Sequence, residues 1–292
     1  MSVLLAFIAS VLVSSTTPLA IQWSQQGVGL FFAVSFRMMI GLTLCLALLG
    51  ITKTPFPRHE LAIRIYLLSG LGFYCGITCS YWGLQLIPSG WSSVLFGLSP
   101  IFNGFVARHL LSEPFGWNRI VGSIAGLSGL GIIFLQGIKG DFRNVTLGVF
   151  VTLVAVFIFS VTTVLVKKTG RQIDSMAIAT GSLIIMSPCF LATWYLSEGG
   201  LPLAIPWRSL GAILYLASFS TVIGFIALYY LLERVDASVA ALPNLIAPLI
   251  AVGLGFALNG EELKPGFMLG AVFILAGLAL FQWGGLMSRN VS

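Results

Sequence analysis

The amino-acid sequence predicts an all-α integral membrane protein with ten transmembrane helices, arranged as two inverted repeats of five helices. Three observations predict this fold. Of the 292 residues, 58% are hydrophobic and 8% are charged, whereas a water-soluble domain carries about 25% charged residues. The apolar residues form ten runs, each about long enough to cross a bilayer core of roughly 30 Å. The two halves of the chain also align with one another.

Ten apolar runs are predicted to cross the membrane in chain order. In lipid, each must close its backbone hydrogen bonds internally, so helices are expected, and the short alternating segments of a barrel are missing from the sequence. The first run has no basic segment before it, and we expect it to be kept as a helix rather than removed as a signal peptide. The runs cover residues 3–23, 29–51, 61–87, 91–111, 118–137, 145–166, 176–196, 209–232, 238–258 and 266–287.

The distribution of basic residues predicts the orientation in the membrane. Cytoplasmic ends of membrane helices are enriched in Lys and Arg, and an orientation with both termini in the cytoplasm places ten basic residues inside and four outside. The location expected is the inner (plasma) membrane of the cell. The inside set is Lys53, Arg58, Arg64, Arg108, Arg119, Lys167, Lys168, Arg171, Arg234 and Arg289, and the outside set is Lys139, Arg143, Arg208 and Lys264.

An internal repeat appears when the sequence is shifted by 148 residues against itself. Matches of Leu and Gly arise easily in membrane segments, whereas matches of Pro, Glu and Tyr in one register do not. Five spans in each copy place the second copy upside down relative to the first, as in many secondary transporters. The sequence therefore predicts one repeat over residues 1–143 and an inverted one over residues 144–292. The informative pairs are Tyr81 with Tyr229, Pro100 with Pro248, and Glu113 with Glu261.

Short motifs in both halves resemble the EamA domain of the drug/metabolite transporter superfamily. The resemblance implies ten helices in two inverted repeats, and transport of amino acids, other metabolites, drugs or nucleotide sugars, often outward. Bacterial aromatic amino acid exporters are among the most similar members in general appearance. The motifs are Tyr81 to Gly90, Ser99-Pro100, Leu110 to Glu113 and Gly122 to Gly131, then Asp236-Ala237-Ser238, Ala247-Pro248, Asn259-Gly260-Glu261 and the stretch from Gly270 onward.

Arg37 is the one basic residue predicted to lie inside the membrane, several residues into the second run. A charge at such a position is costly, and it normally faces a cavity or a partner. One interpretation is a cationic site for a substrate carboxylate or phosphate. The alternative is a structural arginine that bonds backbone carbonyls or reaches to the nearby interface.

Polar and aromatic side chains on the third run form a second candidate. Tyr74, Thr78, Tyr81 and Gln85 recur at spacings of four, three and four, which places them on one helical face. In lipid such a face is expected to look inward, either as a cavity wall that binds substrate or as a surface for helix–helix hydrogen bonds.

The fourth and ninth runs carry the remaining candidates for a substrate site. The fourth run places four residues on one face, and the ninth brings Asn244 to the position equivalent to Phe96. Trp91 and Tyr230 are further candidates, with interfacial anchoring as the alternative. Hydroxyls on the first and sixth runs either line a cavity or bond their own backbone. The face of the fourth run is Ser92, Phe96, Ser99 and Asn103, and the hydroxyls are Ser14, Thr16, Thr17, Ser160, Thr162 and Thr163, with Gln22 nearby.

Four further residues are predicted to act in structure or gating. Pro100 and Pro248 remove backbone hydrogen bonds and can kink their helices, while Glu113 and Glu261 suit helix N-termini, where carboxylates are favourable. The GxxxG motif from Gly122 is expected to pack helices within one chain rather than to form a dimer. We expect a monomer or a weak homodimer.

No catalytic or metal site is predicted. The two histidines and all nine acidic residues lie near helix ends, so a proton carrier at mid-membrane is missing, and no cofactor or nucleic-acid partner is expected. The four cysteines lie in apolar runs, where packing explains them. The favoured function is a secondary transporter of small metabolites, with amino acids, aromatic ones included, as the substrate and export as the direction. The alternatives are a drug or nucleobase exporter, a channel and an intramembrane enzyme.

Overall fold

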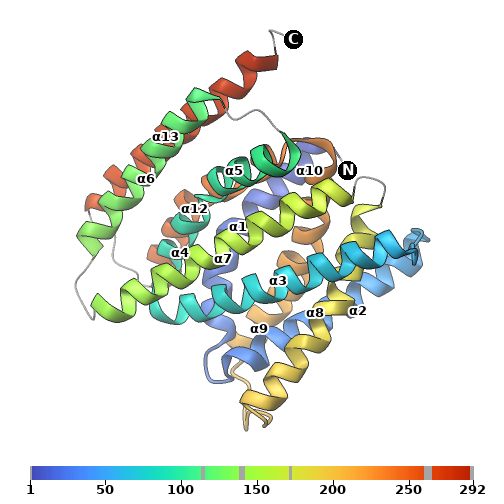
Figure 1. The fold of residues 1–292 in the computed structure, drawn as a ribbon. Helices are drawn as coiled ribbons and strands as arrows, with labels where there is room; N and C mark the ends of the chain where they lie inside the picture. The colour runs from blue at the N-terminus through green and yellow to red at the C-terminus, as the bar shows by residue number, and fades with distance from the viewer. Residues whose placement is uncertain (1, 113–115, 138–141, 171–172, 260–264, 290–292) are drawn as a thin grey trace.

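The computed structural model describes residues 2–112, 116–137, 142–170, 173–259 and 265–289, and every regular element in these ranges is a helix (Figure 1). The all-α prediction is therefore confirmed for this part of the chain. The first six helices are α1 (Val3–Ser24), α2 (Leu30–Thr52), α3 (Glu60–Leu86), α4 (Ser89–Phe96), α5 (Ser99–Leu111) and α6 (Trp117–Gly137). The others are α7 (Phe142–Thr169), α8 (Ser175–Ser197), α9 (Trp207–Tyr215), the π-helix η1 (Leu216–Ile223), α10 (Gly224–Arg234), α11 (Ala237–Ala240), α12 (Pro243–Asn259) and α13 (Pro265–Arg289).

Seven segments within the described ranges are long and apolar enough to cross a membrane. They coincide with seven of the ten predicted runs, so the chain is a multi-pass membrane protein. The full count of ten spans stays a prediction. The seven segments are α1, α2, α3, the α4–α5 unit (Ser89–Leu111), α7 over Arg143–Thr169, α8 and the α9–α10 unit (Trp207–Arg234).

The fourth run is not one continuous helix, which corrects the sequence-based expectation for residues 91–111. Helix α4 ends at Phe96, and Gly97 and Leu98 form a turn before α5. Pro100 has no N–H to donate to the Phe96 carbonyl, and Ser99 Oγ donates to that carbonyl instead, at 2.5 Å. Pro100 therefore stands in the first turn of α5, where a missing N–H is tolerated.

The ninth run is also broken, at Ala241 and Leu242 between α11 and α12. Pro243 opens α12, and Pro248 lies inside this helix. The two breaks lie against one another, because a Cβ added at Gly97 would come within 3.4 Å of the Asn244 carbonyl oxygen and 3.5 Å of Pro248 Cγ. A Cβ at these distances would be in ordinary van der Waals contact, so the two segments pack directly against one another.

The eighth run contains a π-helical segment, η1, between α9 and α10. A π-helix adds residues to a turn and so changes which side chains share a face, and such segments often occur at functional sites. Two hydroxyl residues of η1, Ser220 and Thr221, are buried.

Helices α6 and α13 pack tightly along their length and lie side by side at one edge of the molecule (Figure 1). A Cβ at Gly122 would lie 2.4 Å from the carbonyl oxygen of Gly277, and one at Gly129 would lie 2.5 Å from that of Gly270. Small residues permit this approach, which drives helix association in lipid. The prediction that the GxxxG motif packs helices within the chain is confirmed.

A carboxylate joins the beginning of α2 to the end of α8. Glu198 accepts hydrogen bonds from the backbone N–H groups of Phe31 at 2.9 Å and Phe32 at 3.0 Å. Negative charge is favourable at a helix N-terminus, where these N–H groups lack helical partners. Gly29, with φ of 85°, precedes the helix, and a Cβ there would lie 2.7 Å from Glu198 Oε2.

Helices α3, α8 and α10 meet around a buried polar cluster. The Tyr229 hydroxyl hydrogen-bonds to Ser69 and, at 3.1 Å, to Ser182, while the two serine hydroxyls lie 2.6 Å apart. All three side chains are buried. Polar groups inside a membrane bundle hold helices together in this way.

Candidate functional site

A central cavity of about 210 Å³ lies between helices of both halves of the chain. Helices α1, α3, α4, α7, α10 and α12 form most of its wall, with single residues or pairs from α2, α5, α11 and η1. Five of the predicted substrate-binding residues line it: Arg37, Tyr81, Ser99, Asn103 and Asn244. The other polar residues of the wall are Ser10, Ser14, Thr17, Ser80, Ser92, Ser93, Ser160, Thr163 and Ser220.

Arg37 is held in the cavity wall by three hydrogen bonds. Its Nε donates to Thr221 Oγ1 at 2.9 Å, one terminal nitrogen donates to Ser220 Oγ at 3.0 Å, and the other donates to the Tyr81 hydroxyl at 3.1 Å. Thr17 Oγ1 lies 2.9 Å from Ser220 Oγ and extends the network to α1. The guanidinium is thus oriented by side chains from two other helical elements, α3 and η1.

The charge of Arg37 has no counter-ion in the described part of the chain, where no carboxylate lies within salt-bridge distance of it. The side chain is only 5% exposed. A guanidinium carries five N–H donors, and the three hydrogen bonds above leave two of them free among the described residues. An uncompensated charge at such depth normally faces a ligand or a pathway.

Two amides define the other polar parts of the cavity. Asn244 Oδ1 accepts from Ser14 Oγ at 2.7 Å, and Asn244 Nδ2 donates to Ser99 Oγ at 3.4 Å. Asn103 Nδ2 donates to the Ala237 carbonyl at 3.2 Å, and its Oδ1 accepts from Thr163 Oγ1 at 3.4 Å. These bonds link α1, α5, α7 and α12 around the two helix breaks.

Phenylalanine rings form the apolar part of the wall. Phe73 lies 5.3 Å from Phe159 and 4.9 Å from Phe225, and Phe96 lies 5.7 Å from Phe159, measured between ring centroids. All four rings line the cavity. Such rings suit an apolar or aromatic part of a ligand, because offset and edge-to-face ring contacts are favourable at these separations.

Three of the predicted residues of α3 lie outside the cavity. The Tyr74 hydroxyl hydrogen-bonds to Thr193 Oγ1 at 2.7 Å, Thr78 Oγ1 donates to the Tyr74 carbonyl at 2.8 Å, and Gln85 Nε2 donates to Gln25 Oε1 at 3.1 Å. The stripe that faces the cavity begins one residue earlier. It consists of Phe73, Ile77, Ser80 and Leu84, with Tyr81 at its edge.

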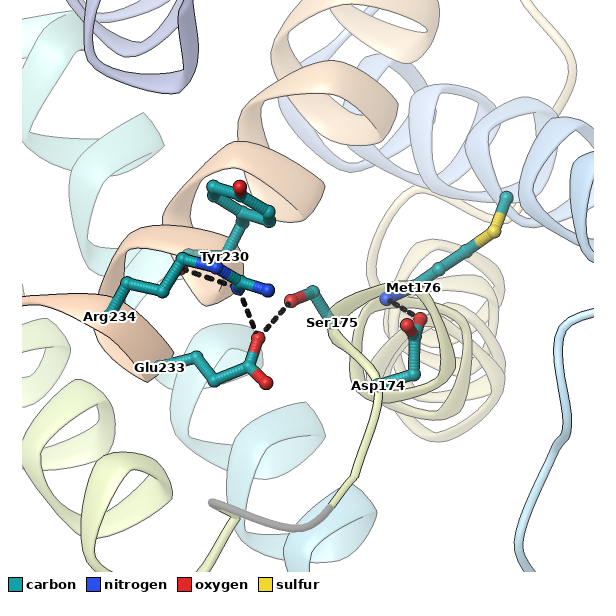
Figure 2. A network of polar contacts seen from close by, with 6 residues as sticks. All are labelled: Asp174, Ser175, Met176, Tyr230, Glu233 and Arg234. Atoms are coloured by element: carbon teal, nitrogen blue, oxygen red, sulfur yellow. Dashed lines mark hydrogen bonds and ion pairs between the residues drawn. The ribbon is translucent and has the colours of Figure 1, made fainter. Parts of the chain in front are cut away.

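Trp91 and Tyr230 also lie outside the cavity wall. Tyr230 belongs to a polar network between the last turn of α10 and the first turn of α8 (Figure 2). The Arg234 guanidinium lies 3.7 Å from the centre of the Tyr230 ring and bonds Glu233, whose carboxylate also accepts from Ser175 Oγ at 3.5 Å.

Of the two prolines predicted to act in structure or gating, Pro100 stands directly after the break in the fourth run, whereas Pro248 lies inside α12, near Gly97. Glu113 and Glu261 lie outside the described residues.

Ser220 and Thr221 were not predicted, although they hold Arg37. The signal present in the sequence is a group of hydroxyl residues inside the eighth apolar run, Ser218, Ser220 and Thr221. Helical periodicity alone does not show which of them faces inward, because η1 departs from the α-helical repeat.

The helical fold and the polar cavity between its halves are those expected of a membrane transporter of small molecules. The family comparison agrees: residues 1–135 and 146–283 each match the EamA-like transporter family. The chain belongs to this family, and the resemblance noted in its motifs is confirmed. Members of the family are transporters rather than enzymes.

Several curated proteins are similar to the chain. It is 25% identical over 246 residues to the uncharacterized transporter YoaV of Bacillus subtilis, covering 83% of each chain. It is 26% identical over 294 residues to an S-adenosylmethionine/S-adenosylhomocysteine transporter of Chlamydia trachomatis, covering 96% of this chain and 88% of the relative. It is 24% identical over 260 residues to a probable terminal-alkyne amino-acid exporter of Streptantibioticus cattleyicolor, covering 86% and 84%.

A crystal structure of a protein with no stated function has the same fold. The TM-score is 0.78 with 17% sequence identity, over 100% of this chain and 99% of the other.

Proposed function

We propose that the chain is a secondary transporter that exports amino acids, aromatic ones included, across the inner membrane. Arg37 carries the proposal: among the described residues it is the sole charged residue of the cavity wall, it has no carboxylate partner, and two of its N–H groups are free. A carboxylate is the group that matches a guanidinium fork. The Tyr81 hydroxyl accepts from Arg37, which leaves its own hydrogen for the same carboxylate.

The size of the cavity favours a small metabolite over a drug. Sites for drug-sized ligands measure about 300–1,000 Å³, and the cavity measures about 210 Å³. The four Phe rings suit an apolar or aromatic side chain. Two of the relatives are named for an amino-acid substrate and for S-adenosylmethionine, a molecule that contains an amino-acid group.

Alternating access between two inverted repeats, residues 1–143 and 144–292, is the proposed mechanism. The packing of the helices supports it, because the contacts between the two halves form a symmetric set. Helix α1 packs on α10 and α12, and α7 packs on α3 and α5, while α2 packs on α8 and α6 on α13. Exchange of the two halves turns the contacts of α1 into those of α7 and leaves the α2–α8 and α6–α13 pairs unchanged. The GxxxG motif is used within the chain, which supports a monomer.

Counterflow in proteoliposomes tests the proposed function. Each of the twenty standard amino acids is preloaded in turn, and uptake of the same amino acid in labelled form is measured. For at least one amino acid, preloading should accelerate uptake. A carrier shows this acceleration and a channel does not. Arg37→Gln should abolish that uptake without loss of monodispersity. The matched control is Leu71→Ala, an exposed position of α3, which should retain it. Normal transport by Arg37→Gln would refute the role of Arg37.

A further inference from the structure

Three buried hydroxyls in the cavity wall lack hydrogen-bond partners. Ser92, Ser93 and Ser160 are 0%, 2% and 1% exposed, and the Oγ atom of each has no partner in the described part of the chain. We call these residues the hydroxyl cluster. Burying a hydroxyl without a hydrogen bond is unfavourable, so three such groups on one wall need an explanation.

Other hydroxyls in the helices of this chain behave differently. A serine or threonine in a helix commonly donates to the carbonyl four residues earlier. Here Ser15 does so at 2.6 Å, Thr152 at 2.8 Å and Ser182 at 2.6 Å. The members of the hydroxyl cluster do not, and all of them line the central cavity. Each Oγ atom is itself buried in the wall, so a group inside the cavity would meet it after rotation of the serine side chain.

The surroundings of the hydroxyl cluster favour a positively charged group. Ser92 and Ser93 come from α4, which ends in the cavity wall at Phe96, and the C-terminal end of a helix favours positive charge. Ser160 comes from α7 and follows Phe159, whose ring lies 5.7 Å from that of Phe96. Aromatic faces also attract cations. Carboxylates are missing from the described wall, so hydroxyl oxygens are the acceptors on this side.

We propose that the hydroxyl cluster binds the ammonium group of the transported amino acid. This inference rests on the proposed function, and it assigns the second charged group of the substrate to a second part of the cavity. Arg37 binds the carboxylate, and the ammonium would otherwise lie desolvated in a cavity that already holds one positive charge. The hydroxyls of α4 and α7 provide acceptors for its N–H groups. The transporter therefore selects zwitterionic amino acids over simple carboxylic acids.

The test compares an amino acid with its deaminated analogue, which keeps the carboxylate and the side chain. The amino acid used is the standard one that gives the wild-type protein its largest counterflow signal, and binding of both compounds is titrated to the purified protein. Wild type should bind the amino acid at least tenfold more tightly. The triple variant Ser92→Ala, Ser93→Ala, Ser160→Ala should lose that preference, with binding of the analogue unchanged within about twofold.

Ser15→Ala is the matched control, because Ser15 is a fully buried serine whose hydroxyl bonds its own helix outside the cavity. It should keep the wild-type preference. If the triple variant does not fold, Ser160→Ala alone should reduce the preference at least threefold. Equal weakening of both compounds, or full preference in a folded variant, would overturn the proposal.

Two further outcomes separate this proposal from others. If wild type binds the analogue as tightly as the amino acid, and Arg37→Gln loses binding of both compounds, the ammonium site is overturned. The proposed function then still stands. Wild type that responds to no amino acid would overturn both. A preference that vanishes when choline replaces sodium would identify a bound sodium ion as the occupant of the hydroxyl cluster, and would overturn the ammonium site.

Discussion

Replacement of Tyr81 by phenylalanine isolates one hydrogen bond of the Arg37 network. Tyr81 is fully buried, its hydroxyl accepts from Arg37 at 3.1 Å, and the centre of its ring lies 5.9 Å from the guanidinium carbon. Tyr81→Phe keeps the ring and removes the hydroxyl. A hydrogen bond to a charged group contributes about 1.5–3 kcal/mol, so the free energy of unfolding should fall by that amount. Loss of the donor to the substrate carboxylate should weaken binding about tenfold, or about 1.4 kcal/mol.

A double-mutant cycle with Arg37→Gln checks this reasoning. If Tyr81 acts through Arg37, Tyr81→Phe should lower the free energy of unfolding by less than about 1 kcal/mol in the Arg37→Gln background. That is the contribution of an ordinary neutral hydrogen bond. The coupling energy should then lie between about 0.5 and 3 kcal/mol, above the 0.3–0.5 kcal/mol error of additivity. Both quantities are measured by unfolding in detergent and by ligand titration. Additive effects of the two substitutions would refute the proposed network.

Three further substitutions test the fold. Glu198→Gln should lower the free energy of unfolding by about 1 kcal/mol, because one charged acceptor at the start of α2 is lost. Its control is Glu60→Gln, which breaks an exposed pair with Arg64. This control should lower the free energy of unfolding by less than half of that amount in the same thermal unfolding assay. Gly122→Ala should lower the free energy of unfolding by about 1–3 kcal/mol or more, because the new Cβ would lie 2.4 Å from the backbone of α13. Its control is Gly131→Ala, which has open space around it and should leave stability unchanged or raise it. Tyr229→Phe should lower the free energy of unfolding by about 0.5–1.5 kcal/mol, because its hydrogen bonds to Ser69 and Ser182 are lost while the two serines still bond one another; unchanged stability would contradict the described cluster.

Some of the site was predictable because it depends on local pattern. Arg37 stands out in an apolar run whatever the packing, since a charge in lipid needs a reason. The face of the fourth run was also placed correctly: Ser92, Phe96, Ser99 and Asn103 all line the central cavity. The break at Gly97 did not disturb that face, because the α4 and α5 segments keep their cavity sides on one wall.

The face of α3 was not predictable in the same way. The spacing of Tyr74, Thr78, Tyr81 and Gln85 shows that they share a face, but spacing alone does not orient that face. Packing of α3 between α7 and α8 sets its rotation, and Tyr74 consequently bonds α8 while Phe73 enters the cavity. Of the four polar residues, Tyr81 lines the cavity.

Composition and periodicity by themselves determined that this chain is a helical membrane protein and where seven of its membrane segments lie, because the hydropathy of each segment is a local property. Tertiary structure decided which polar groups meet. Ser220 and Thr221 reach Arg37 across 183 and 184 residues of sequence, through a π-helical segment whose register departs from the α-helical repeat. The three serines of the hydroxyl cluster become unusual only when the fold shows that their buried hydroxyls have no hydrogen-bond partner among the described residues. Contacts between distant segments arise from packing, and packing is a property of the whole chain.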